Sequence, residues 1–160
     1  TTYAAYSETW NGTSWSEGNN LTTLRTDTTG VGIVTAALCI AGYSPPGTTD
    51  KVESYNGTCW TETSTDVNTA RGEAGSSGTS TACLYYGGSP GNQDITESFN
   101  GTTWTEVGDM ATGRTNMGNA QSPTGINTSA LAIGGQTPST TSAVEEWSGA
   151  PVTVKTVTVS

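Results

Sequence analysis

Histidine is absent from this chain, and two other chemically useful residue types are scarce. The 160 residues include no histidine, three cysteines and five lysines or arginines. Without an imidazole, the chain lacks the base of serine and cysteine triads and the usual ligands of zinc and copper. The odd number of cysteines, at Cys39, Cys59 and Cys83, argues against a disulfide framework. We therefore predict a protein that is not an enzyme and that carries no metal or cofactor.

Basic residues and long apolar stretches are equally scarce. Five cations stand against 14 acids, for a net charge of -9. Such a charge opposes binding to nucleic acid or to anionic membranes. No apolar stretch reaches the roughly 18 residues of a membrane span, and no signal-peptide pattern is present. Helical periodicity is also missing, while Thr, Ser, Gly and Asn dominate, which favours an all-β fold.

What the chain does contain is a repeated phrase, Glu-x-aromatic-Asn-Gly-Thr-x-Trp. It occupies residues 8–15, 53–60 and 97–104, and a degenerate copy begins at Glu145. The leading glutamates are 45, 44 and 48 residues apart. A fixed period of this size indicates stacked supersecondary units, none of which buries its apolar face alone.

Each unit also carries an arginine followed by a glycine-rich stretch and an apolar run. The arginines are Arg25, Arg71 and Arg114. The apolar run ends in a glycine pair in two units, at Gly87 and Gly88 and at Gly134 and Gly135, whereas the first unit has Ala41-Gly42. We expect the turn at this point to differ slightly in the first unit.

These landmarks predict four short strands per unit. A strand of small residues comes first, and the apolar run follows as a strand buried on both faces. The third strand alternates polar and apolar residues, and the fourth begins at the tryptophan. The Asn-Gly between the third and fourth strands predicts a type I′ turn, in which both central residues have positive φ. In one unit the first, third and fourth strands are expected at Gly30–Val34, Lys51–Tyr55 and Trp60–Thr63.

The order of arginine, small-residue strand, diglycine, Glu-x-aromatic, Asn-Gly and tryptophan resembles the kelch repeat over almost the whole chain. The resemblance implies an all-β, kelch-type β-propeller segment of about three and a half four-stranded antiparallel blades. Residues 1–20 would supply the outer half of a blade. Complete blades would occupy 21–65, 66–109 and 110–160, the last including a C-terminal strand tail.

Rings of this kind typically need about four to eight blades. We therefore expect the chain to be part of a larger protein or assembly. The strand-prone tail at 151–160 is expected to form the outer strand of the last blade; donation to a neighbouring subunit is the alternative.

Most of the repeated residues are expected to be structural. The tryptophans Trp15, Trp60 and Trp104 should pack between neighbouring blades. The three arginines should pair with carboxylates between strands or blades, and Glu53 and Glu97 belong to the repeated carboxylate column. A carboxylate pair for glycoside hydrolysis is the alternative use of these acids, but their appearance once per unit favours the framework role.

A few residues are candidates for contact with glycans. Tyr43 follows the glycine turn in a loop with two prolines, where its ring is suited to stacking on a sugar; an ordinary loop tyrosine is the competing interpretation. Five Asn-x-Ser/Thr sequons occur, and three of them coincide with the Asn-Gly turns, so glycosylation is a secondary interpretation. The sequons lie at Asn11, Asn20, Asn56, Asn100 and Asn127.

The amino-acid sequences of several segments also resemble those of a narrower group of kelch-like repeats. "ESYNGTCWTE", "NTAR" and "SFNGTTWTEVGDM" are similar to the kelch-like repeats of environmental phages and some bacteria. This implies a virion or extracellular surface location, in a tail fibre or appendage that contacts other virion proteins, further copies of the chain or host glycans. The alternatives are an extracellular bacterial adhesin or filament module that binds carbohydrate, and an intracellular adaptor.

Overall fold

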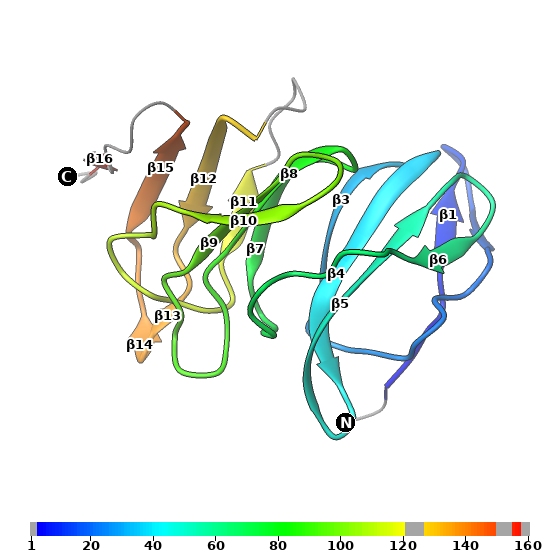
Figure 1. Cartoon of the computed structure of the whole chain (residues 1–160), viewed down its shortest axis with the longest axis horizontal. Helices are drawn as coiled ribbons and strands as arrows, with labels where there is room; N and C mark the ends of the chain where they lie inside the picture. The colour runs from blue at the N-terminus through cyan, green and yellow to red at the C-terminus, as the bar shows by residue number, and fades with distance from the viewer. Residues whose placement is uncertain (1–2, 121–126, 150–154, 158–160) are drawn as a thin grey trace.

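The computed structural model describes residues 3–120, 127–149 and 155–157, and in these residues all regular structure is β. Three four-stranded antiparallel sheets lie side by side, as Figure 1 shows. Their strands follow one another in chain order. The expected all-β fold, with four-stranded antiparallel sheets, is therefore confirmed.

Each sheet lies within one of the expected units. Sheet 1 comprises β3 (Thr29–Ile33), β4 (Ala36–Ser44), β5 (Gly47–Tyr55) and β6 (Trp60–Glu62). Sheet 2 comprises β7 (Gly75–Thr79), β8 (Ala82–Tyr86), β9 (Thr96–Phe99) and β10 (Trp104–Val107). Sheet 3 comprises β11 (Gly118–Ala120), β12 (Ser129–Ile133), β15 (Val144–Ser148) and β16 (Lys155–Val157).

Two short hairpins complete the described strands. The N-terminal hairpin joins β1 (Glu8–Trp10) to β2 (Trp15–Glu17) and falls within residues 1–20. The other joins β13 (Gln136–Thr137) to β14 (Ser139–Thr140), between β12 and β15. Of the tail expected at 151–160, Lys155–Val157 forms the outermost strand of sheet 3; the rest lies outside the described residues.

The apolar second strand of sheet 2 is buried on both faces, as predicted. Cys83 and Tyr85 belong to the core between sheets 1 and 2, whereas Leu84 and Tyr86 belong to the core between sheets 2 and 3. All four side chains are at most 3% exposed. Because strand side chains alternate between faces, one run of apolar residues joins three sheets.

The glycine-rich first strands lie next to one another: β3 beside β7, and β7 beside β11 (Figure 1). The glycine pair after β8 allows another close approach, to the loop that leads into β7. Gly88 has φ +113°, and a Cβ there would lie 2.7 Å from the carbonyl oxygen of Gly72. In sheet 1 the corresponding Ala41-Gly42 contains a register shift, and β4 and β5 continue as a longer hairpin to Ser44 and Gly47.

The Asn-Gly turns do not have the predicted type I′ geometry. Only the glycines have positive φ, for example +96° at Gly12, and four residues separate the paired ends of the strands. Asn11 acts through its side chain, whose Oδ1 accepts the backbone N–H groups of Thr13 and Ser14 at 2.9 and 3.0 Å. The asparagine thus replaces a backbone acceptor, a local hydrogen bond that short amide side chains favour.

Candidate functional site

The repeated arginines and glutamates form one buried ion pair in each sheet. Arg71 Nη1 donates to Glu97 Oε1 at 2.5 Å, and both side chains are fully buried. Arg25 Nη2 lies at the same distance from Glu53 Oε1, and Arg114 pairs with Glu145. The expected arginine–carboxylate pairing therefore occurs between the loop ahead of a sheet and the third strand of that sheet.

Arg71 is also bound to three backbone oxygens. Arg71 donates to the carbonyls of Thr69, Tyr85 and Gly87 at 2.8 to 3.1 Å. Its guanidinium carbon also lies 4.1 Å from the centre of the Tyr85 ring. A buried charge is tolerated when it is paired and its hydrogen-bonding capacity is used, so this arginine fastens its leading loop to the sheet.

Each glutamate holds the same loop from the other side. Glu97 accepts the backbone N–H groups of Asn68 and Thr69. Glu53 accepts those of Thr22 and Thr23. The oxygens of these two carboxylates are occupied by an arginine and two backbone donors. Glu53 and Glu97 are therefore poor candidates for glycoside hydrolysis.

Neighbouring sheets are linked through the loops that carry these arginines. The carbonyl of Arg71 accepts Gly42 N–H at 3.0 Å and the Tyr85 hydroxyl at 2.6 Å. The carbonyl of Arg114 accepts Gly88 N–H at 2.9 Å. Burial raises the pKa of Tyr85, so its hydroxyl stays neutral and keeps donating.

A second link between the sheets escaped the sequence analysis. Asp27, Glu73 and Asn116, each two residues after an arginine, have φ of 54 to 55°. Glu73 N–H donates to the carbonyl of Asp27, and Asn116 N–H to that of Glu73, both at 2.9 Å. These residues act through their backbone, and their side chains differ from unit to unit. No residue type therefore marked the position in advance.

The three repeated tryptophans are buried to very different degrees. Trp104 is 7% exposed, stacks on Phe99 at 4.9 Å and meets the edge of Tyr85. Trp60 is half-buried beside Tyr55. Trp15 is 64% exposed. The expectation that every one of them packs between units is therefore wrong for Trp15, because no described sheet lies against its face.

The hairpin β1–β2 has the register of β5–β6 and β9–β10 but lacks their surroundings. Glu8 is paired across the strands with Glu17, as Glu97 is with Glu106. Unlike Glu97, Glu8 is exposed and forms no ion pair with any described side chain. A groove of about 590 Å³ separates β1 from β3 and β4. Glu8, Tyr6, Cys39 and Trp60 are among its lining residues.

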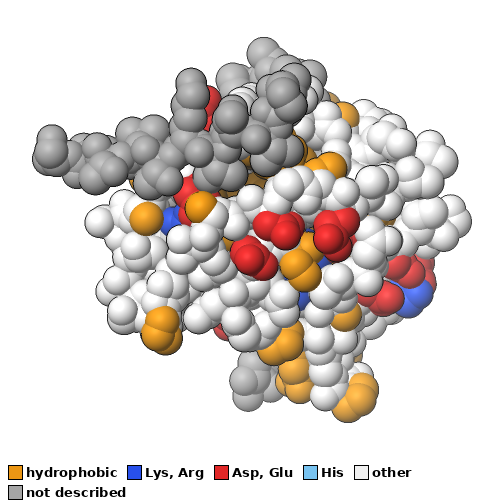
Figure 2. Space-filling model, turned by 60° about the vertical axis from the view of Figure 1, so that its left-hand side comes forward, with side chains coloured by type: hydrophobic (Ala, Val, Ile, Leu, Met, Phe, Trp, Pro, Cys, Tyr) orange, Lys and Arg blue, Asp and Glu red, His pale blue; other side chains and the backbone are white. Residues whose placement is uncertain are grey.

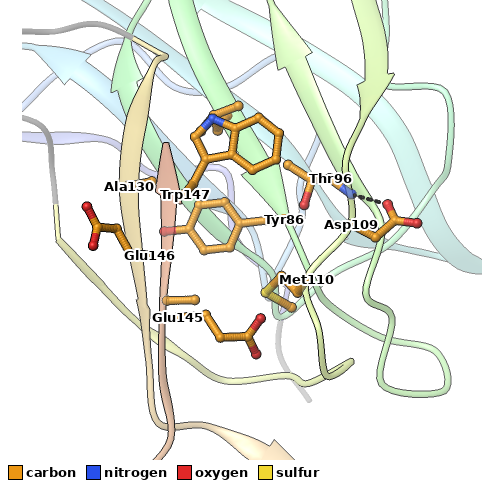
Figure 3. A pocket seen from close by; sticks show the side chains of 10 residues that line it. Tyr86, Thr96, Asp109, Met110, Ala130, Glu145, Glu146 and Trp147 are labelled. Carbon is orange, nitrogen blue, oxygen red and sulfur yellow. Dashed lines mark hydrogen bonds between the residues drawn. The ribbon is translucent and has the colours of Figure 1, made fainter. Parts of the chain in front are cut away.

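Between sheets 2 and 3 the packing leaves only a small space of about 30 Å³. Figure 3 shows Tyr86, Trp147 and Met110 around it, with Asp109 accepting the backbone N–H of Thr96 at 3.2 Å. This volume is about that of one water in the liquid, whereas sites for small molecules measure roughly 300 to 1,000 Å³. The space is a small packing void in the core and is too small to be a site for such a molecule.

Tyr43 has little free ring surface. Its ring stacks on Tyr3 with centroids 5.8 Å apart and an angle of 16° between the planes. Its hydroxyl donates to the carbonyl of Pro46 at 3.1 Å. One face is therefore occupied by another aromatic ring, which leaves less room for the predicted stacking on a sugar.

The five sequons fall in different surroundings. Asn11, Asn56 and Asn100 sit in exposed turns, where each side-chain oxygen accepts two backbone N–H groups. Asn127 donates from Nδ2 to Ser98 Oγ at 2.8 Å and to the Phe99 carbonyl, so its amide nitrogen is engaged in the structure. Asn20 is exposed.

The described part of the chain contains no group of three or more Cys, Asp or Glu side chains placed to hold a metal ion. It also contains no helix with the length and apolar character of a membrane span. On the face shown in Figure 2, acidic side chains are more prominent than basic ones, in keeping with the net charge of -9.

Comparison with known proteins relates this chain to others through its fold. No protein-family model matches the sequence, and no curated protein is similar to it. The fold is similar to that in the solved structure of YjhT, with a TM-score of 0.76 at 13% sequence identity. The match covers 98% of this chain, which spans 59% of the YjhT chain.

Proposed function

We propose that the three sheets and the N-terminal hairpin are blades of a kelch-type β-propeller, present here as about three and a half units. The proposal is supported by the adjacent first strands of successive sheets and by the kelch-like order of repeated residues. In a propeller, each sheet packs its faces against the next sheet around a common axis. The two-sided burial of β8 is the packing that such an arrangement requires.

Within that fold, the module has a structural and binding role without catalysis. One observation carries this proposal: the repeated arginines, and the glutamates that pair with them in the three sheets, are buried and bound to one another and to backbone groups. Arg25, Arg71 and Arg114 are at most 4% exposed, as are Glu53 and Glu97. Polar residues that recur from unit to unit, and whose charges and hydrogen-bonding groups are occupied in this way, maintain the framework. The loops, which vary between units, remain available for contact with partners.

The location we propose is a virus particle, in a tail fibre or another surface appendage. The phage-like wording of the repeats supports it, together with a composition rich in Thr, Ser, Gly and Asn. Mass spectrometry of purified particles tests it: the tryptic peptide from Gly72 to Arg114 should co-purify with infectious particles through a density gradient. Recovery of this peptide only from host cytosol would contradict the proposal.

A carbohydrate-binding adhesin is the second candidate, favoured by the exposed aromatic rings of the hairpin. Trp10 and Trp15 are 48% and 64% exposed with ring centroids 5.6 Å apart, and nearby Tyr6 is 75% exposed. Amphipathic aromatic rings are common in recognition surfaces. A glycan array with the intact chain and with Trp15→Ala separates the two candidates. No binding to any glycan would count against the adhesin and leave the scaffold, whereas sugar binding that the substitution abolishes would place the glycan contact at this hairpin.

A further inference from the structure

We propose that the Asn-Gly turns are sites of spontaneous modification, in which each asparagine side chain becomes aspartate or isoaspartate through a cyclic imide. The sites are Asn11-Gly12, Asn56-Gly57 and Asn100-Gly101. No enzyme or cofactor takes part, because the turn itself supplies the nucleophile and the groups that stabilise the reaction. This inference goes beyond the proposed function and depends neither on the propeller nor on where the protein resides.

The reaction begins when the backbone nitrogen of the glycine attacks Cγ of the preceding asparagine. A bond forms between this nitrogen and Cγ, the nitrogen loses its proton, and the bond from Cγ to Nδ2 breaks. The side-chain nitrogen leaves as ammonia with that proton, and a cyclic imide remains. Water then opens the ring, at Cγ to give aspartate or at the backbone carbonyl carbon to give isoaspartate. The net change is the exchange of an amide for a carboxylic acid, with water consumed and ammonia released.

The first observation is the environment of the side-chain carbonyl. Oδ1 of Asn11 accepts the backbone N–H groups of Thr13 and Ser14 at 2.9 and 3.0 Å. Oδ1 of Asn56 and Oδ1 of Asn100 each accept two such groups at 2.9 Å. Negative charge develops on this oxygen when the glycine nitrogen attacks Cγ. Fixed backbone donors at about 2.7–3.1 Å are the arrangement that stabilises such an oxyanion.

The second observation is that the leaving nitrogen is weakly held. Nδ2 of Asn11 donates to Ser14 Oγ across 3.4 Å, and Nδ2 of Asn56 donates to the sulfur of Cys59 at 3.6 Å. The side chain of Asn100 is bound to the described residues through Oδ1 alone. All three asparagines are exposed. Ammonia can therefore leave, and water can reach the imide.

The third observation concerns the attacking residue. Glycine has no side chain to obstruct the approach of its nitrogen to Cγ of the residue before it. Gly12, Gly57 and Gly101 are exposed and have φ of +91 to +96°, a conformation that glycine adopts most readily. The turn that favours glycine for its backbone therefore also favours the reaction.

Two other asparagines of the described chain lack these features. Asn68 precedes a threonine, and its Nδ2 donates to Glu97 Oε2 at 2.9 Å. Asn127 also precedes a threonine, and its Nδ2 donates to Ser98 Oγ at 2.8 Å. In both, the leaving nitrogen is bound and the attacking nitrogen lies beside a β-branched side chain. They are the internal controls for the three turns.

The fold is suited to the aspartate product. Asn100 serves its turn as an acceptor, and a carboxylate there can accept the same two N–H groups with the added strength of its charge. Isoaspartate instead lengthens the backbone of the loop that joins the paired residues Phe99 and Trp104. We expect Asn100→Asp to unfold at the same urea concentration as the unchanged chain. Asn100→Ala, which removes the acceptor, should unfold at a lower one.

Incubation of the intact native chain at mildly alkaline pH tests the reaction, with tryptic digestion and mass spectrometry before and after. The tryptic peptide 52–71 contains both Asn56 and Asn68, so it reports a proposed site and a control together. Asn56 should convert at least about tenfold faster than Asn68, because a hydrogen bond to a charged group must break at Asn68. Asn11 and Asn100 should convert as Asn56 does. Isoaspartate should accompany aspartate, because the imide opens on either side.

Gly12→Ala is the matched variant within one turn. A Cβ at this position would meet nothing within 4 Å. The methyl group should slow conversion of Asn11 about tenfold or more, because it displaces the attacking nitrogen from its path to Cγ. Asn56 and Asn100 in the same molecule should convert at their usual rates, which shows that the rest of the chain is unchanged.

Several results would overturn the proposal. Conversion in the urea-unfolded chain but not in the native chain would mean that the turns protect their asparagines. Equal rates at Asn56 and Asn68 in the native chain would remove the role of the turn, and conversion without isoaspartate would exclude the imide. Unfolding of Asn100→Asp at the same urea concentration as Asn100→Ala would show that the turn does not accept the product. None of these results bears on the particle location, which the mass spectrometry of purified particles decides separately.

Discussion

Sheet 2 and the N-terminal hairpin contain the same phrase in the same register, yet their side chains have opposite environments. In sheet 2, Phe99 and Trp104 are 6% and 7% exposed. In the hairpin, the equivalent Trp10 and Trp15 are 48% and 64% exposed. Glu97 is fully buried against an arginine, whereas Glu8 is exposed and no described side chain forms an ion pair with it.

The comparison distinguishes the structure that the repeated motif forms by itself from the burial that adjacent strands and sheets provide. The Asn-Gly loop and the pairing of the two strands form in both places, because the asparagine side chain and the glycine act within four residues. Burial requires two inner strands and neighbouring sheets. Among the described residues, sheet 2 has both inner strands and a sheet packed against each of its two faces. In repeat architectures, stability comes largely from such interfaces between units.

The largest effect should come from breaking the buried pair of sheet 2. Glu97→Gln leaves Arg71 buried without its counter-charge, and we expect it to lower the free energy of unfolding by about 3–5 kcal/mol. Glu8→Gln, at the same register in the hairpin, should change it by less than about 0.5 kcal/mol. Urea unfolding followed by tryptophan fluorescence and circular dichroism measures both.

A double substitution shows whether the charge is the cause. Replacing both Arg71 and Glu97 by methionine removes the uncompensated charge, and it should cost less than Glu97→Gln alone. Equal destabilisation by Glu97→Gln and Glu8→Gln would mean that burial does not distinguish the two regions.

A smaller effect is expected from a single methyl group at a glycine. Gly88 and Gly12 both have positive φ, at +113° and +96°, but a Cβ at Gly88 would meet Gly72 O at 2.7 Å, whereas one at Gly12 would meet nothing within 4 Å. Gly88→Ala should therefore cost about 2–4 kcal/mol from backbone strain and overpacking together. Gly12→Ala should cost only the strain of about 1–2 kcal/mol. Thermal and urea unfolding of the two variants make the comparison, and similar values would remove close packing as the reason for Gly88.

The sequence predicted the fold better than it predicted the surroundings of individual residues. The period of the glutamates and the positions of the arginines, diglycines and Asn-Gly pairs indicated four strands per unit. They did so because hydrophobic alternation and turn residues act locally. The sequence also predicted that the arginines pair with carboxylates, because unlike charges that recur together are commonly partners.

The features that the sequence did not predict depend on contacts with neighbouring sheets and on backbone geometry. Trp15 and Trp104 end the same repeated motif, so nothing in the motif indicates that one is exposed and the other buried. The inter-sheet bonds at Asp27, Glu73 and Asn116 use only backbone groups. The predicted type I′ turn requires positive φ at Asn11. Instead, the Asn11 side chain stabilises the turn by accepting two backbone hydrogen bonds. Each of these features depends on tertiary context or on a choice between two local uses of one residue.

The smallest contrast between the two regions should appear in chemical labelling of the cysteines, which requires no substitution. Cys83 is fully buried between sheets 1 and 2, and burial raises its pKa to about 12. Cys39, which lines the groove beside the hairpin, is 7% exposed and its pKa is raised by burial as well. The thiolate is the reactive form, so at pH 8 the native Cys83 should react at least about a thousandfold more slowly than a free thiol.

Cys59, in the half-exposed hairpin loop, should be alkylated first, Cys39 more slowly and Cys83 only on unfolding. Iodoacetamide labelling followed by peptide mass spectrometry gives the three rates. If Cys83 reacts as fast as Cys39 in the native protein, the interface between sheets 1 and 2 is no more closed than the groove, and the contrast between the two regions does not hold in solution.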